Sequence, residues 1–144
     1  MKFRSLGLAA ICTVSLALPA WAHHSHVAYD LSKWYYMEGK VTQVQTMNPH
    51  SWIYMEVGEI KDEAGQVVKA ARDEKGQPTV WALEAGSPAQ IQRKGIKKGD
   101  VLPGDRIKVR CRPVRDGTNG CLLGFVTPMH GDKTRGADIE LEWD

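Results

Sequence analysis

Ser-Trp-Ile-Tyr-Met-Glu-Val, residues 51–57, carries the clearest structural signal in the chain. Ile53, Met55 and Val57 are apolar and would face a core, whereas the residues between them are aromatic or acidic. A period of two residues is typical of a β-strand with one buried face. The pattern therefore predicts a strand that covers one side of a small core.

Segments of similar composition follow at intervals along the chain. Strands are predicted over Trp34–Thr46, Thr79–Glu84, Arg106–Arg112 and Gly120–Met129, with an edge strand near Ile139–Trp143. A short helix is predicted over Pro88–Lys94, because Ser87 suits the N-cap, proline suits the first helical position and Gly95 suits the C-terminal cap.

Three strands, a short helix and a hairpin form the element order of an OB-fold. We therefore predict an all-β domain with one short helix, folded as a small OB-fold-like Greek-key barrel of five to six strands. Gly39 would mark the bend in the long first strand. An immunoglobulin-like sandwich is the alternative, but it requires about seven strands.

The first 22 residues have the three parts of a secretory signal peptide. Lys2 and Arg4 precede an apolar run from Leu6 to Leu18, and Ala20-Trp21-Ala22 supplies the small residues of a cleavage site. The run is shorter than the roughly 20 residues that span a bilayer. We expect cleavage after Ala22, periplasmic localisation, no membrane span and a single barrel domain over residues 23–144.

Cleavage would leave a mature chain with a neutral charge balance. The two basic residues of the signal are lost, so 19 basic and 17 acidic side chains become 17 of each. A neutral surface does not attract nucleic acid by charge. We therefore expect no nucleic-acid partner, and a metal ion, a small molecule or a periplasmic protein instead.

Two cysteines remain after cleavage, Cys111 and Cys121, on either side of a turn-rich stretch. A hairpin would bring them together, and an oxidising compartment favours a disulfide. A dithiol metal site is the alternative.

All five histidines lie in the mature chain, and His23 would become its first residue. An N-terminal histidine offers its α-amine and ring Nδ1 to a metal, and a second imidazole would complete a T-shaped set of three nitrogens that suits Cu(II). His50 is the expected second imidazole. Further candidate ligands are His24, His26, His130, Met47 and Met129.

Topology supports this grouping, because strands one, three and five of an OB barrel run in the same direction. His50, Glu84 and His130 are therefore expected at one end of the barrel. The eleven residues before Trp34 reach about 35 Å when extended, so the terminus can fold back to them. In the alternative interpretation, the histidines form a mobile tail, Asn48-Pro49-His50 is a simple turn, and the methionines fill the core.

The aromatic residues suggest a second function. Trp52, Tyr54 and Trp81, with Glu84, lie on the strands where OB-folds bind ligands, so the protein is alternatively a non-catalytic module for a small apolar or aromatic ligand or for a partner protein. No nucleophile elbow, H-E-x-x-H sequence or phosphate-binding loop is present, so catalysis is not expected.

Four sequence segments together resemble a family of small exported bacterial proteins known only as a domain of unknown function. The segments are His23-His24-Ser25, Asn48-Pro49-His50-Ser51-Trp52, residues 81–88 and Pro103-Gly104-Asp105. The resemblance covers nearly the whole mature chain and implies a secreted single domain with no established activity. This chain differs from the pattern at His26 and in the long connection from Lys61 to Thr79.

Overall fold

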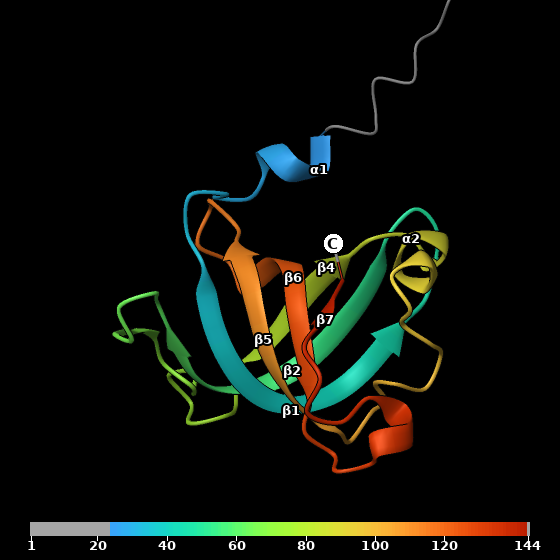
Figure 1. Cartoon of the computed structure of the whole chain (residues 1–144). Helices are drawn as coiled ribbons and strands as arrows, with labels where there is room; N and C mark the ends of the chain where they lie inside the picture. Colours follow the sequence, from blue (N-terminus) through green and yellow to red (C-terminus); the bar gives the residue numbers. More distant parts are fainter. Residues whose placement is uncertain (1–23, 144) are drawn as a thin grey trace, which may run out of the picture.

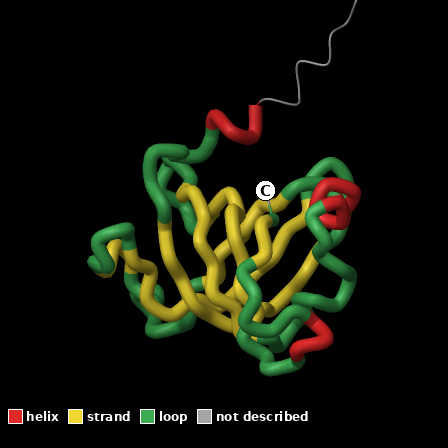
Figure 2. Tube along the Cα trace, viewed as in Figure 1, coloured by secondary structure: helices red, strands yellow, loops and turns green. Residues whose placement is uncertain are grey.

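The computed structural model describes residues 24–143, so the predicted signal peptide and His23 lie outside the described residues. Two short α-helices and one 3-10 turn accompany seven strands (Figures 1 and 2). The helical elements are α1 (His24–Val27), α2 (Pro88–Arg93) and η1 (Lys133–Arg135). The strands are β1 (Tyr35–Gln45), β2 (Ser51–Lys61), β3 (Val67–Lys69), β4 (Val80–Ala85), β5 (Arg106–Pro113), β6 (Gly120–Pro128) and β7 (Leu141–Glu142).

Five of the strands close into a barrel. Their order is β1-β5-β6-β4-β2, and β1 also pairs with β2, which completes the circle. β4 and β6 are parallel, and the other pairs in the barrel are antiparallel. β3 extends the sheet beside β2, and β7 pairs with β6. The predicted all-β barrel is thus confirmed, with two additional short strands.

Gly39 lies where β1 runs unusually close to β2. The pairing of β1 with β2 shifts register between Met37 and Gly39. A Cβ atom at position 39 would lie 2.0 Å from the carbonyl oxygen of Glu56, far closer than two such atoms can approach. Only glycine therefore allows β1 to pass this close to β2, which gives a structural reason for the glycine within this strand.

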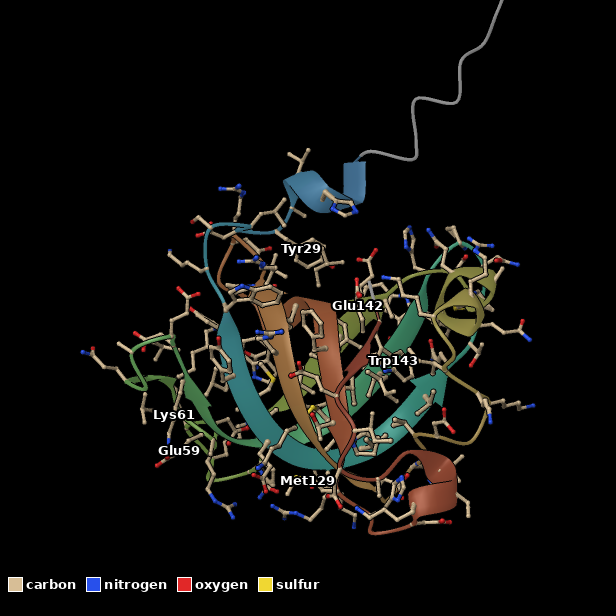
Figure 3. All side chains as sticks on the ribbon, in the orientation of Figure 1. Tyr29, Glu59, Lys61, Met129, Glu142 and Trp143 are labelled. Carbon is tan, nitrogen blue, oxygen red and sulfur yellow. A yellow bond between two sulfur atoms is a disulfide. The ribbon has the colours of Figure 1, made fainter. Side chains whose placement is uncertain are left out.

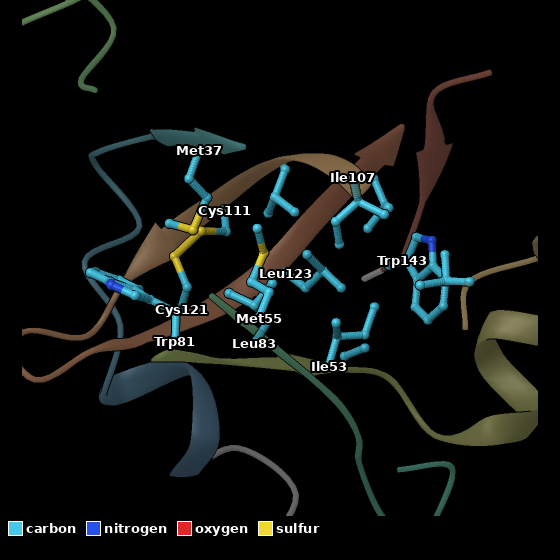
Figure 4. Packing of buried hydrophobic residues seen from close by; sticks show 14 of the residues in the cluster. Met37, Ile53, Met55, Trp81, Leu83, Ile107, Cys111, Cys121, Leu123 and Trp143 are labelled. Atoms are coloured by element: carbon cyan, nitrogen blue, oxygen red, sulfur yellow. A yellow bond between two sulfur atoms is a disulfide. The ribbon is translucent and has the colours of Figure 1, made fainter. Parts of the chain in front are cut away.

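Side chains alternate between the two faces of each strand, and those that point inward fill the barrel interior (Figure 4). Ile53, Met55, Leu83 and Ile107 are completely buried. The predicted disulfide between Cys111 and Cys121 is confirmed, with both cysteines in this core and Cα atoms 5.7 Å apart. The two residues are diagonal neighbours, because Cys111 faces Leu123 and Cys121 faces Pro113 across the hairpin.

α2 follows β4, packs at one end of the barrel through Ile91, and begins as the sequence predicts. The Ser87 hydroxyl accepts a hydrogen bond from the Gln90 amide, and the Gln90 side chain accepts one from the Ser87 amide. The helix ends at Arg93, one residue earlier than predicted, and the chain turns at Gly95 with φ of 87°. Within residues 24–143, no helix has the length and apolar character needed to cross a membrane.

Candidate functional site

Glu84 is the acidic residue at the centre of the candidate site. It lies in β4 directly opposite Trp52 of β2, whereas its neighbour Leu83 lies opposite Ile53 in the core. Successive side chains of a strand point to opposite faces, so Glu84 points to the outer face of the barrel. It is nevertheless only 6% exposed. A carboxylate buried on an outer face needs both a cover and polar partners.

The cover is the polar segment that precedes β1. The Asp30 amide donates to the Pro113 carbonyl at 2.8 Å, and the Arg115 amide donates to the Ala28 carbonyl at 2.8 Å. Tyr29 forms a β-bridge with Val114 between these two bonds. The segment therefore runs beside the turn between β5 and β6, and α1 lies above the upper side of the barrel (Figure 1).

Tyr29 connects this segment to Glu84. Its side chain is 5% exposed, and its hydroxyl donates a hydrogen bond of 2.5 Å to Glu84 Oε2. Burial, the hydrogen bond to Glu84 and the negative charge of this carboxylate raise the pKa of the Tyr29 hydroxyl far above its ordinary value. The Tyr29 hydroxyl therefore stays protonated at physiological pH and remains the hydrogen-bond donor to Glu84.

His50 contacts the other oxygen of the same carboxylate. It follows a cis peptide bond between Asn48 and Pro49, in the loop that joins β1 to β2. His50 Nδ1 lies 3.2 Å from Glu84 Oε1, and the His50 side chain is 39% exposed. Each oxygen of Glu84 thus faces one partner. A carboxylate beside Nδ1 favours the tautomer with the proton on that nitrogen and leaves Nε2 as the basic one.

Two of the three predicted aromatic residues share the outer face with Glu84. The Trp52 and Tyr54 rings are stacked, with centroids 6.4 Å apart and an interplanar angle of 23°. The placement of Trp81 on this face is wrong. Trp81 is an inward residue of β4 that is 1% exposed, because it alternates with Glu84 along the strand and packs in the core.

The expected grouping of His130 with His50 and Glu84 is also wrong. Glu84 pairs with Leu122 near the start of β6, and the strand continues for six more residues, about 20 Å, before it ends. Met129, which precedes His130, therefore lies at the opposite end of the molecule from Tyr29 (Figure 3).

His130 has a different role in its own surroundings. Its Nδ1 accepts a hydrogen bond from the Asp132 amide, and its Nε2 lies 3.1 Å from the Asp100 carbonyl oxygen. Both nitrogens are thus used to hold two loops together, and neither is free for a metal.

The remaining candidates lie close to His50 or to the N-terminus. Met47 is 51% exposed and precedes His50 in the same loop, and His26 is exposed at α1. The side chain of His24 and all of His23 lie outside the part that the structure describes. Within residues 24–143, no three His, Cys, Asp or Glu side chains form a group that could hold a metal ion.

Tyr29 is the site residue that the sequence did not identify. The only local signal is an aromatic residue in a short stretch of mixed composition, between Val27 and Trp34. Its partner, Glu84, is 55 residues away in sequence. No spacing rule connects two residues whose contact depends on how a terminal segment folds back.

Comparison with known proteins gives one result. The sequence model of a family of unknown function, DUF6152, matches residues 11–123. The searches of curated proteins and of solved structures gave no match.

Proposed function

The chain belongs to the DUF6152 family of unknown function, and from its own residues we propose that it is a periplasmic copper-binding protein. A free N-terminal His23 and the imidazole of His50 would hold Cu(II). The observation that carries the proposal is the double use of Glu84, which contacts His50 with one oxygen and binds the N-terminal segment through Tyr29 with the other.

The contact with Glu84 supports a ligand role for His50. Histidines that bind metals usually direct their second ring nitrogen at a carboxylate, which fixes the orientation of the ring and increases its basicity. His50 has this arrangement, and among the described residues no hydrogen bond to its Nε2 is formed. Nε2 is therefore the nitrogen that we assign to the metal.

Tyr29 supports the contribution of the N-terminus. His23 precedes Tyr29 by six residues, a reach of about 20 Å at most. Since Tyr29 is anchored beside Glu84, the terminal histidine needs to cross only this short distance to reach His50. Free α-amines ordinarily have a pKa of about 8, so copper would need to displace only a weakly held proton from the α-amine that cleavage at Ala22 exposes.

The other ligands of the proposal follow from position. His24 and His26 are secondary nitrogen candidates, and Met47 is a thioether candidate that would favour Cu(I). The signal peptide predicted from the sequence and the disulfide between Cys111 and Cys121 support the periplasm as the compartment.

Isothermal titration with Cu(II) tests the proposal. The protein is exported and processed, and mass spectrometry establishes that it begins at His23. We expect one tight site, and far weaker binding when a single glycine precedes His23 or when His50 is replaced by alanine. H130A is the matched control and should bind copper as the wild type does. Equal affinity of the glycine-extended protein would refute the proposal.

A second candidate function rests on the stacked rings of Trp52 and Tyr54 beside Glu84. Such a pair can bind a small apolar or aromatic ligand without catalysis. Titration of a ligand panel followed by tryptophan fluorescence, with and without a chelator, distinguishes the two functions. Binding that persists in chelator and is lost in W52A would support this candidate.

A further inference from the structure

A cavity lies between the end of β1, α2 and the loop from Ile96 to Pro103. Its volume is about 420 Å³, within the usual range for small-molecule sites. The cavity exists because α2 is only six residues long and buries a single side chain, Ile91, so it does not fill this end of the barrel. Its apolar wall includes Val44, Ile91, Ile96, Val101, Leu102 and Trp143.

Two polar groups in the wall have no partner. Ser51 and Trp143 both line the cavity, and each is more than nine-tenths buried. Within residues 24–143, neither Ser51 Oγ nor Trp143 Nε1 forms a hydrogen bond. Figure 4 shows Trp143 at the end of the core that faces α2. A buried hydroxyl and a buried indole N–H without partners are unfavourable in a fully packed wall.

The rim of the cavity is positively charged. Arg93, Lys94, Lys97 and Lys98 lie within six residues of one another, and the last two line the cavity. Lys94 is paired with Glu142 at 2.9 Å, whereas the other three form no ion pair within the described part of the chain. Among residues 24–143, no acidic side chain lines the cavity. The rim is therefore suited to an anionic group.

We propose that this cavity binds a small amphipathic carboxylate, with an aliphatic or aromatic body inside and its charged group beside Lys97 and Lys98. The apolar wall selects the body, and the two lysines select the sign of the charge. The site is separate from the copper site, because Ser51 faces into the barrel, whereas His50 contacts Glu84 on the outer face.

Titration with decanoate in the presence of a chelator tests this proposal independently of copper. We expect saturable one-to-one binding by calorimetry, and changes in NMR chemical shift at Val44, Ile91 and the indole N–H of Trp143. Decylammonium, which has the opposite charge on a chain of the same length, should bind at least about tenfold more weakly.

Charge reversal at the rim provides the second test. The variant K97E/K98E should weaken decanoate binding by about tenfold, whereas K40E/K75E, with the same change in net charge at exposed lysines outside the cavity, should bind like the wild type. The proposal is overturned if decanoate does not saturate, if decylammonium binds equally well, or if the chemical shift changes appear at Trp52 and Tyr54.

Discussion

Replacement of Tyr29 by phenylalanine removes one oxygen atom and keeps the aromatic ring. The lost hydroxyl donates to Glu84, and both residues are at least 94% buried, so water does not readily replace the bond. A hydrogen bond to a charged group stabilises a protein by about 1.5–3 kcal/mol. We expect the free energy of unfolding of Y29F to fall by about 2 kcal/mol, or about 30-fold in the folding equilibrium.

Urea unfolding followed by tryptophan fluorescence measures this difference. The matched control is Y36F, since Tyr36 is 38% exposed and its hydroxyl has no hydrogen bond within residues 24–143. This control should change the free energy of unfolding by less than about 0.5 kcal/mol. If Y29F is as stable as Y36F, the Tyr29–Glu84 bond does not anchor the N-terminal segment, and the reasoning for the copper site fails with it.

The pH dependence of the difference in unfolding free energy between wild type and Y29F provides an independent check of the Tyr29–Glu84 hydrogen bond. The pKa of Tyr29 is raised in the folded protein above its ordinary value of 10.0. Above pH 10 only the unfolded chain releases this proton, which favours unfolding. The contribution of Tyr29 is therefore fully present below pH 10 and decreases as the pH rises further. The difference in unfolding free energy between wild type and Y29F should therefore decrease above pH 10. A difference that stays constant would contradict a raised pKa of Tyr29 in the folded protein.

Three further variants test the fold. The double variant C111A/C121A should lose about 3 kcal/mol in urea unfolding because it reopens a loop of ten residues, and a loss below 1 kcal/mol would count against a stabilising bridge. G39A should unfold at much lower urea, because its Cβ would overlap a backbone oxygen 2.0 Å away, and wild-type stability would disprove the close strand approach. H130A should melt at lower temperature than the wild type because two loop contacts are lost; an unchanged melting temperature would exclude this structural role.

The elements of the barrel could be predicted because their signals are local. The alternation from Ile53 to Val57 indicates one buried face, and the sequence Ser87-Pro88 favours a helix start through the preferences of its own two residues. The disulfide was also predictable, since Cys111 and Cys121 flank a turn that brings them together. Each of these features depends on residues within about ten positions of one another.

The candidate site was only partly predictable because it depends on contacts between distant residues. Strand direction correctly placed His50 near Glu84, but the same reasoning failed for His130, since β6 continues well past the point where it pairs with β4. The burial of Glu84 by Tyr29 depends on the path of the N-terminal segment. That path has no periodic pattern, so the sequence did not reveal it.

Electron paramagnetic resonance of one equivalent of Cu(II), bound to the exported protein that begins at His23, tests the copper site most directly. The spectrum should show hyperfine coupling to three nitrogens, from the α-amine, the His23 ring and the His50 ring, and H50A should show two. A spectrum that does not change in H50A would contradict the assignment of His50 as a ligand.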